Sequence, residues 1–488
     1  MPETVFEPVI GLEIHVQLNT ATKLFCGCAA DSAAAPNTNI CPVCTGQPGS
    51  LPVLNRKAVE LAVRAAAALD CEISERSVFS RKNYFYPDCP RNYQISQYDK
   101  PLALRGRIRI ETGPAEHTAE KIIGITRVHV EDDAGKSLHA IGSAELDYTL
   151  VDFNRAGVPL IEIVSEPDMR SPDEAYSYLA ALKNALVWSG VSSCDMEKGE
   201  LRVDVNLSLR PAGQERFGTK VELKNLNSFK AVKDALHHEI TRQAAVLNSG
   251  GIIMQETRLW DEKAGQTVLM RIKEDAHDYR YFPEPDLVPL APAPGWVAEI
   301  KAALPELPQA RRARFIRDYA LGPYDAGVLL GDRATGDYFE AVMRAGKLPA
   351  KTAANWIGTN MLAKLNSEKL TAAGSKIRPE ALAELLALIE AGRISATTGK
   401  EVFERMWATG KAAADIVAES GLAQVSDDGA LRDWAKAAIA ANPKAVEDLK
   451  SGNEKAISAL VGFIMRQSKG KANPGLANKI IRELTGRA

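Results

Sequence analysis

Hydrophobic and polar residues alternate along residues 9–18, which read VIGLEIHVQL. Isoleucine, leucine and valine occupy one side of this stretch, and Glu13 and His15 fall on the other. A period of two over this length is typical of a β-strand with one buried face. Its other face carries a carboxylate and an imidazole, both of which can bind a metal or move a proton. A solvated strand surface produces the same pair, so the rest of the chain must decide between these interpretations.

The same alternation recurs along the first 294 residues, where helical periods interrupt it. It predicts strands at 121–130, 146–152, 160–164, 201–209 and 219–223, and the helical periods predict helices at 55–69, 171–189 and 228–248. Alternating strands favour an antiparallel sheet with one working face over a doubly wound parallel sheet, whose strands are continuously apolar. The expected fold class is therefore α+β.

A stretch rich in proline, FPEPDLVPLAPAPGW at 282–296, marks the expected end of the sheet region. Beyond it the alternation gives way to helical periods at 311–319, 338–345, 353–365, 379–391 and 400–407. We predict a sheet domain at 1–294, an all-α domain at 295–407 and a small all-α tail domain at 408–488.

Composition limits the function classes. The chain of 488 residues is 45% hydrophobic and 25% charged, as is ordinary for a soluble globular protein. No apolar run approaches the roughly 20 residues that span a bilayer, and the start MPETVFEP lacks the apolar core of a secretory signal. A cytoplasmic protein without membrane contact is expected. The formal net charge of −2 means that a nucleic-acid partner needs a local basic patch.

The end of the chain offers such a patch. After Gly462 there are six basic residues and a single acid, Glu483. This composition suits contacts to a phosphate backbone, and it equally suits a solvated helix end. The basic residues are Arg466, Lys469, Lys471, Lys479, Arg482 and Arg487.

Four of the seven cysteines form two close pairs. One residue separates Cys26 from Cys28, two separate Cys41 from Cys44, and twelve residues connect the pairs. In a reducing compartment, clustered cysteines indicate metal more often than disulfides. Four thiolates complete a tetrahedral zinc shell and leave no open position, so we predict a structural zinc site, with a reduced loop as the alternative.

Acidic and imidazole groups recur on the polar faces of the predicted strands. Glu131 shares a face with His129, Glu162 interrupts an apolar strand, and Asp204 lies on the polar face of 201–209. An ionised group inside a buried strand is costly unless it is paired or binds a metal. With Glu13 and His15, these acids would form an oxygen-rich site that suits Mg²⁺ and phosphoryl chemistry.

Two basic residues beside aromatic ones are candidate phosphate ligands. Lys82 lies in SRKNYFYP and Arg280 in DYRYF. Cations, amides and aromatic rings together are typical of recognition loops, although an aromatic cluster without a ligand is the alternative for the first. The AGKS string at 134–137 is not a P-loop, because valine occupies its first glycine position at 130.

Together these motifs resemble the family of B subunits of aspartyl/glutamyl-tRNA amidotransferases. The matching strings are VIGLEIHVQL, RKNYFYPD, YQISQYDKP, HVEDDAGKS, VDFNRAGVPLIEIVSEPDMRSPDEA, FGTKVELKNLNSF and DYRYFPEPDLVPL, and the resemblance extends from residue 9 to the end. It implies an antiparallel cradle domain similar to the glutamine synthetase catalytic fold. A helical domain and a YqeY-like tail would follow it and contact tRNA.

The resemblance also implies an activity and its partners. ATP would phosphorylate the side-chain carboxylate of Glu or Asp mischarged on tRNA(Gln) or tRNA(Asn), and ammonia would displace the phosphate. The amidase partner of such enzymes, their A subunit, would release this ammonia from glutamine, and a small C subunit would complete a heterotrimer. The cysteines suggest the zinc-containing branch of the family, with zinc supporting the fold or the interface with the amidase.

The resemblance assigns roles to individual residues. The family's Mg²⁺ and ATP positions correspond to Glu13, His15, Glu131 and Glu162, with Lys82 and Asp204 near the phosphates, and these six are the expected catalytic residues. Arg280 is expected to bind the nucleotide together with Lys82 and Asp204 because of its basic and aromatic segment, not because of the resemblance.

Two other functions compete with this expectation. A non-catalytic tRNA-binding scaffold would explain the helical tail but not the acids and imidazole on inward sheet faces. A free-standing ATP-dependent ligase for a small carboxylate would explain the site, but it lacks an ammonia source and does not need the tail.

Overall fold

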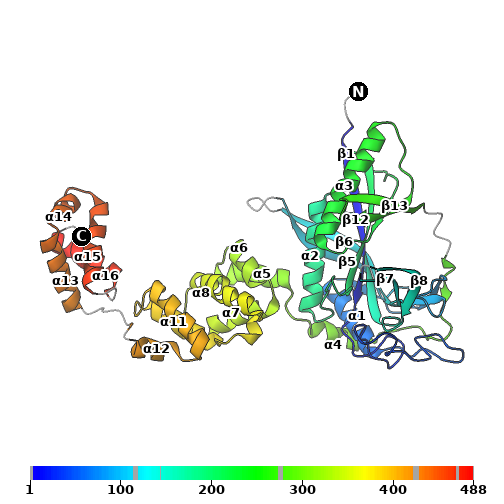
Figure 1. The fold of residues 1–488 in the computed structure, drawn as a ribbon, viewed down its shortest axis with the longest axis horizontal. Helices are drawn as coiled ribbons and strands as arrows, with labels where there is room; N and C mark the ends of the chain where they lie inside the picture. Colours follow the sequence, from blue (N-terminus) through cyan, green and yellow to red (C-terminus); the bar gives the residue numbers. More distant parts are fainter. Residues whose placement is uncertain are drawn as a thin grey trace. The chain divides into compact units, whose positions relative to one another are not determined.

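The computed structural model describes residues 4–113, 119–142, 144–272, 279–420, 422, 428–468 and 472–486. The chain forms two compact units, Met1–Leu307 and Pro308–Ala488 (Figure 1). Helix α4 (Pro294–Ala302), which follows the stretch rich in proline, belongs to the first unit because its Ile300 joins that unit's core. The basic residues Lys469, Lys471 and Arg487 lie outside the described ranges.

A nine-stranded sheet organises the first unit, in the order β13-β12-β11-β10-β1-β9-β6-β5-β2. Its strands are β1 (Phe6–Gln17), β2 (Glu72–Ile73), β5 (Ala103–Thr112), β6 (Ala119–Asp132), β9 (Pro159–Ser165), β10 (Leu201–Pro211), β11 (Val221–Lys224), β12 (Glu256–Asp261) and β13 (Gln266–Ile272). All neighbours are antiparallel except β11 and β12.

The α+β class is confirmed, but the sheet is mixed rather than wholly antiparallel. Between β11 and β12 the chain runs through helix α3 (Phe229–Asn248), and a helical crossover of this kind returns the next strand in the parallel direction. The alternation of single strands does not contain this information, because pairing direction depends on the connection.

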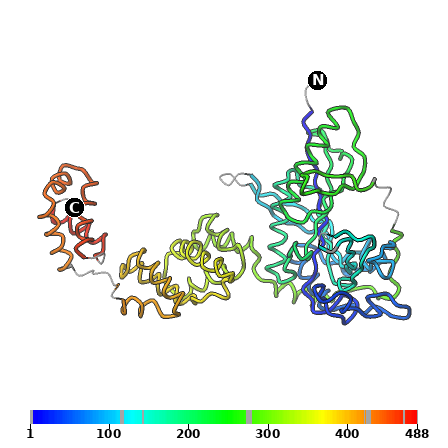
Figure 2. Tube along the Cα trace, viewed as in Figure 1, coloured from blue at the N-terminus to red at the C-terminus, as the bar shows by residue number. Residues whose placement is uncertain are grey.

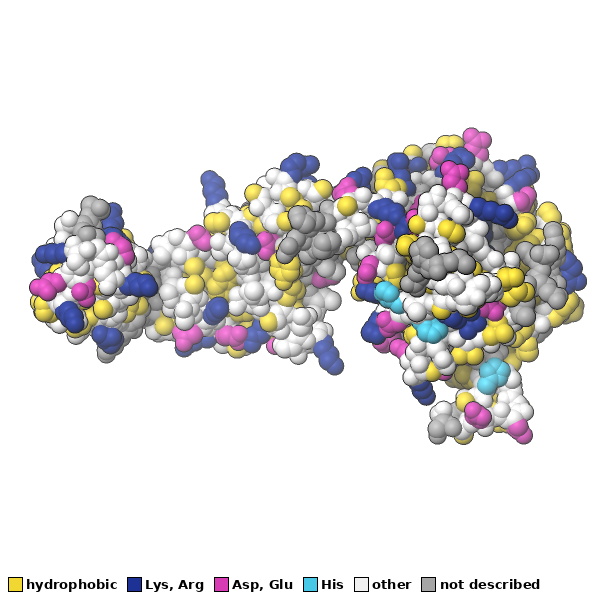
Figure 3. Space-filling model, turned by 90° about the horizontal axis from the view of Figure 1, so that it is seen from above, with side chains coloured by type: hydrophobic (Ala, Val, Ile, Leu, Met, Phe, Trp, Pro, Cys, Tyr) yellow, Lys and Arg dark blue, Asp and Glu magenta, His cyan; other side chains and the backbone are white. Residues whose placement is uncertain are grey.

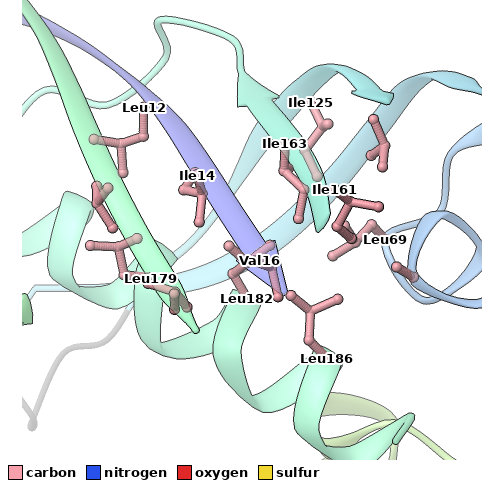
Figure 4. Packing of buried hydrophobic residues seen from close by; sticks show 14 of the residues in the cluster. Leu12, Ile14, Val16, Leu69, Ile125, Ile161, Ile163, Leu179, Leu182 and Leu186 are labelled. Carbon is pink, nitrogen blue, oxygen red and sulfur yellow. The ribbon is translucent and has the colours of Figure 1, made fainter. Parts of the chain in front are cut away.

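Three helices cover one face of the sheet. They are α1 (Arg56–Ala68), α2 (Pro172–Trp188) and α3, and the side chains of Asn55, Ser171 and Ser228 cap their first turns. Leu12, Ile14 and Val16 of β1 point toward Leu179, Leu182 and Leu186 of α2 (Figure 4). Burying each such side chain contributes about 1.5–3 kcal/mol. The apolar side chains of β1 therefore pack against the helices, and its polar side chains lie on the opposite face of the sheet.

Smaller elements complete the first unit. A three-stranded sheet has the order β14-β3-β4, from β3 (Ser80–Asn83), β4 (Tyr93–Ser96) and β14 (Phe282–Pro283). A separate hairpin pairs β7 (Lys136–Ile141) with β8 (Ala144–Asp152). Residues 18–55 follow β1 as a long loop, drawn dark blue in Figure 2. Strand β4 contacts β6, because the Ile95 amide donates to Asp132.

The second unit is helical, as predicted. Its helices are α5 (Pro308–Tyr319), α6 (Pro323–Leu329), α7 (Arg333–Ala345), α8 (Ala350–Trp356), α9 (Leu362–Glu368), α10 (Pro379–Glu390), α11 (Ala396–Thr409), α12 (Ala413–Glu419), α13 (Asp428–Ala441), α14 (Pro443–Lys450), α15 (Ile457–Gln467) and α16 (Pro474–Thr485). Helices α13 to α16 share a core around Leu431, Leu460 and Ile481, while α12 packs against α10 and α11.

The described residues contain no helix that is both long and apolar enough to cross a membrane. Figure 3 shows Lys and Arg side chains mixed with Asp and Glu over the face that it displays.

Candidate functional site

Three neighbouring strands bring two glutamates and two histidines together on the polar face of the sheet. Glu162 of β9 lies in register with His15 of β1 on one side and His129 of β6 on the other. His15 Nε2 is 3.5 Å from Glu131 Oε1 and 3.4 Å from Glu162 Oε2. His129 Nε2 is 3.6 Å from Glu131 Oε2 and 3.2 Å from Glu162 Oε2. We call these four residues the acid–histidine cluster.

The acid–histidine cluster is charged and largely buried, with only the His15 side chain partly exposed. Glu131 is 1% exposed, His129 3% and Glu162 6%. Burial opposes the charged imidazoles, but the adjacent glutamates outweigh it, so the pKa of His15 is raised and that of His129 rises to about 9. Burial also opposes both carboxylates, and the histidines outweigh it and lower the pKa of each glutamate. The four groups thus compensate one another's charge.

The residues of the cluster fit a divalent cation. One ligand atom each from His15, Glu131 and Glu162 lie within 4.8 Å of one another. Ser96 Oγ donates to Glu131 Oε2 at 2.9 Å and orients that carboxylate. Within the described residues, His129 Nδ1 is buried without a hydrogen-bond partner. Two carboxylates with imidazole nitrogen suit Mg²⁺ or a similar hard cation, which would take the place of the imidazole protons.

Lys82 of β3 adds a positive charge beside the cluster. Burial opposes its ammonium form, but Glu131 and Glu162 outweigh burial and raise the pKa of Lys82, with Tyr281 adding to their effect. Its Nζ lies 5.1 Å from the centre of the Tyr279 ring. A lysine that stays charged beside two buried carboxylates is suited to holding phosphate oxygens.

Glu13 and Asp204 lie in a second polar group on the same face. They are paired across β1 and β10. Glu13 accepts a hydrogen bond from Asn206 Nδ2 at 2.9 Å, and Asp204 forms an ion pair with Lys224, whose Nζ is also 3.4 Å from Glu222. The structure therefore brings His15, Glu131 and Glu162 together and places Glu13 with Asp204 beside them.

Arg280 lies next to the aromatic residues of the SRKNYFYP segment. Its guanidinium is 5.7 Å from the centre of the Phe85 ring, and its backbone has φ +44°. Asn83 Nδ2 donates to the Arg280 carbonyl at 2.9 Å and supports this left-handed conformation. Its role as a nucleotide ligand stays a prediction.

Sequence reasoning missed two features of this face. His129 completes the acid–histidine cluster, and its alternation with Glu131 carried the signal. Asp133 contacts Arg202 Nη2 at 2.9 Å, Arg155 Nε at 3.7 Å and Gln17 Nε2 at 3.0 Å. Burial opposes ionised Asp133, but the two arginines outweigh it and lower its pKa. The run of acids in HVEDD hinted at this group, but its arginine partners come from distant strands and loops.

The four clustered cysteines converge as predicted. One sulfur from each of Cys26, Cys28, Cys41 and Cys44 lies within 4.8 Å of the others. Cys41 Sγ and Cys44 Sγ are 3.9 Å apart, against about 3.8 Å for two thiolates of a tetrahedral zinc. The Cys41 amide points at Cys44 Sγ at 3.2 Å. These residues fit a zinc ion, and we call them the cysteine cluster.

A buried lysine ties the cysteine cluster to the rest of the unit. Lys23 is fully buried, with Nζ 3.6 Å from Cys44 Sγ, 2.7 Å from the Asn39 carbonyl and 3.2 Å from the Phe153 carbonyl. Hydrogen bonding from Cys26, helped by Lys23 and opposed by burial, lowers the pKa of Cys44 to about 4. This environment favours a thiolate, the form that binds metal.

Known protein families and relatives match this chain along nearly its whole length. The family model described as the GatB/GatE catalytic domain matches residues 8–298, and the one described as the GatB domain matches residues 337–484. The B subunit of the aspartyl/glutamyl-tRNA(Asn/Gln) amidotransferase from Elusimicrobium minutum is 54% identical over 483 residues, 99% of both chains. The protein of the same name from Persephonella marina is 53% identical over 479 residues, 98% of this chain and 99% of the relative.

Proposed function

The chain belongs to the family of aspartyl/glutamyl-tRNA(Asn/Gln) amidotransferase B subunits, and from this premise we propose that its first unit activates a tRNA-bound carboxylate with ATP and converts it to an amide. The carboxylate is the side chain of Glu on tRNA(Gln) or of Asp on tRNA(Asn). The single observation that carries the proposal is the acid–histidine cluster, in which charged groups are buried together on one sheet face.

Activation is chemically necessary for this reaction. A carboxylate resists attack by ammonia because an oxide would have to leave. Transfer of the terminal phosphoryl group of ATP to one carboxylate oxygen creates an acyl phosphate. Ammonia then attacks the acyl carbon, the bond from carbon to the phosphate oxygen breaks, and inorganic phosphate leaves with the electron pair. The nitrogen loses a proton as the amide forms.

The acid–histidine cluster supplies the setting for phosphoryl transfer. Glu131, Glu162 and His15 would hold Mg²⁺, which supplies charge neutralisation on the nucleotide phosphates. Lys82, which belongs to strand β3 of the three-stranded sheet, would bind the oxygens of the transferred phosphoryl group. Asp204 and Glu13, restrained by Lys224 and Asn206, would orient further groups on the same face.

The remaining assignments follow from family membership. The amidase partner would release ammonia from glutamine and deliver it to this face, and a small third protein, the C subunit, would complete the complex. The acyl phosphate hydrolyses in water, so a closed route for ammonia is expected. Zinc in the cysteine cluster would support the loop. Residues 408–488 would form the YqeY-like tail that contacts tRNA, although their first helix, α12, packs against α10 and α11. The protein would work in the cytoplasm. The cradle would resemble the glutamine synthetase catalytic fold.

The sharpest test is ATP cleavage that depends on mischarged tRNA, measured in the assembled complex with Glu131→Gln. Because the substitution removes one buried charge from the proposed cation site, the rate should fall at least about a hundredfold. Glu120→Gln on the exposed end of the same strand is the matched control and should keep wild-type activity. Glutaminase activity and tRNA binding should survive in both variants. Unchanged ATP cleavage in Glu131→Gln would remove the cluster from the mechanism.

A tRNA-binding scaffold without catalysis is not favoured. It offers no reason for two glutamates to be buried on one sheet face at the cost of desolvation. It also disagrees with a match to a catalytic-domain family over residues 8–298.

A further inference from the structure

Four tyrosines form a continuous row beside the acid–histidine cluster. Tyr98 and Tyr281 are stacked, with ring centres 4.2 Å apart and planes 9° from parallel. Tyr281 meets Tyr279 edge to face at 6.1 Å, and Tyr279 meets Tyr84 in the same way at 6.5 Å. We call this row the tyrosine platform. Tyr98 is 59% exposed, so the row ends in a ring that presents aromatic surface to solvent.

The three-stranded sheet and its hydrogen bonds support the tyrosine platform. Arg81 of β3 donates to both carboxylate oxygens of buried Glu284 at 2.7 and 2.8 Å, which fastens β3 to the segment that contains β14. Asn83 Nδ2 donates to the Tyr279 carbonyl at 3.4 Å. These bonds join two segments that lie about two hundred residues apart in the chain. Rings that are positioned before a ligand arrives lose little freedom on binding.

The platform adjoins the proposed reaction centre. Ser96, which donates to Glu131 at 2.9 Å, lies two residues before Tyr98. Lys82 places its ammonium 5.1 Å from the Tyr279 ring centre. A ligand on the tyrosines would therefore lie next to Lys82 and within reach of the acid–histidine cluster.

Aromatic faces next to cations recognise planar bases that carry phosphate. Stacking on tyrosine suits any base, and Lys82 and Arg280 supply the charge for phosphates. Two sources have this chemistry: the base of ATP, and the unpaired nucleotides at the acyl end of tRNA. A row of four rings extends farther than one base covers. Phe85, 70% exposed, lies under the Arg280 guanidinium, 5.7 Å from its ring centre. An extended row of half-buried rings with one exposed end fits successive nucleotides of a strand.

We propose that the tyrosine platform stacks the unpaired terminal nucleotides of the aminoacyl-tRNA and thereby delivers the attached carboxylate to the acid–histidine cluster. This inference rests on the proposed function and names the part of the substrate that the first unit reads. Tyr98 acts as a positioning residue, because it holds the base and touches none of the reacting atoms.

The test uses the assembled complex and a tRNA with 2-aminopurine in place of its terminal adenine. Fluorescence of this base is quenched on stacking. Tyr98→Ala should abolish most of the quench and raise the KM for mischarged tRNA roughly fivefold or more, the smallest effect expected for one stacked base. Tyr98→Trp should retain the fluorescence quench and the wild-type KM for mischarged tRNA. Tyr148→Ala is the matched control, since Tyr148 is 58% exposed on β8 and outside the platform.

The other outcomes overturn the inference in distinct ways. A raised KM for ATP with an unchanged tRNA quench assigns the platform to the nucleotide base. Wild-type quench and wild-type KM values for both substrates in Tyr98→Ala show that the row has no ligand. Failure of the proposed function is separable, because a complex without ATP-dependent amidation would still report stacking through the quench.

Discussion

The acid–histidine cluster and the cysteine cluster are built in opposite ways. The four cysteines come from one loop of nineteen residues, 26–44, and match one another in chemistry. The four residues of the acid–histidine cluster come from three strands that span residues 15–162, and they mix oxygen with nitrogen donors. A closed shell of four thiolates saturates a metal, whereas three mixed ligands leave coordination positions for substrate. We infer a structural role for the cysteine cluster and a catalytic role for the acid–histidine cluster.

This difference also separates the two clusters energetically. Carboxylates buried without partners are destabilising, so the acid–histidine cluster depends on its histidines or on a cation. The cysteine cluster instead restrains a loop that contains little regular secondary structure. Substitutions in the acid–histidine cluster should therefore act mainly on turnover, and those in the cysteine cluster mainly on stability.

The largest effect after Glu131→Gln should come from His129→Gln. His129 contacts both glutamates, and residues that orient metal ligands typically contribute about 10–100-fold to activity. We expect the rate of tRNA-dependent ATP cleavage to fall within that range. His139→Gln on the exposed hairpin strand β7 is the control and should have no effect. If His129→Gln turned over at the wild-type rate, the cluster would lose one of its four members.

His129 also makes a prediction about pH. Its folded pKa of about 9 lies above the unfolded value of 6.5, so protonated His129 stabilises the metal-free fold. That contribution is fully present below pH 6.5 and is lost as the pH rises through about 9. Thermal unfolding of metal-free protein should show a lower Tm at high pH, and His129→Gln should flatten this dependence. Identical pH profiles for both proteins would contradict the charge pairing.

Glu13→Gln should have a smaller effect than His129→Gln. Glu13 keeps an amide contact with Asn206 and lies opposite Asp204, outside the acid–histidine cluster. We expect less than about a tenfold loss of ATP cleavage, because Glu13 hydrogen-bonds to Asn206 rather than to a residue of the acid–histidine cluster. Steady-state assays of both variants side by side measure the ratio. A loss of ATP cleavage as large as that of Glu131→Gln would indicate that the two polar groups act as one site.

The smallest effect on turnover should come from Cys41→Ser. Removing one thiolate opens the proposed zinc shell, so bound zinc should disappear from purified protein and the Tm should fall. Activity per folded complex should stay within about threefold of wild type. Elemental analysis and calorimetry give the first two values. Deep loss of ATP cleavage at temperatures where the variant is folded would make the cysteine cluster part of the chemistry.

The sequence revealed the faces of this site better than its contacts. Alternation places Glu13 and His15 on one side of β1, and Glu162 is conspicuous within an apolar strand. Which acid meets which histidine depends on strand order and register, and β9 lies between β1 and β6 although β6 precedes it in the chain. Periodicity gives no strand order. For that reason the sequence groups Glu13 with the cluster residues. It does not single out His129, although His129 lies two residues before Glu131 on the same strand face.

Two further gaps have different causes. In β5, Ile108 and Ile110 alternate with arginines as regularly as residues do in β1, yet the predicted strands do not include this one. The ion pair of Asp133 with Arg202 joins β10 to the end of β6, and long-range pairing of this kind has no local signature. By contrast, the cysteine cluster was predictable in full, because its ligands are close in sequence and of a single type.

The proposed function requires an acyl phosphate to form at the acid–histidine cluster. The most direct measurement uses mischarged tRNA whose side-chain carboxylate oxygens carry a heavy isotope. If the carboxylate is phosphorylated, one labelled oxygen must appear in inorganic phosphate for each amide formed, and none should appear with the Glu131→Gln complex. Amide formation that releases unlabelled phosphate would contradict the claim.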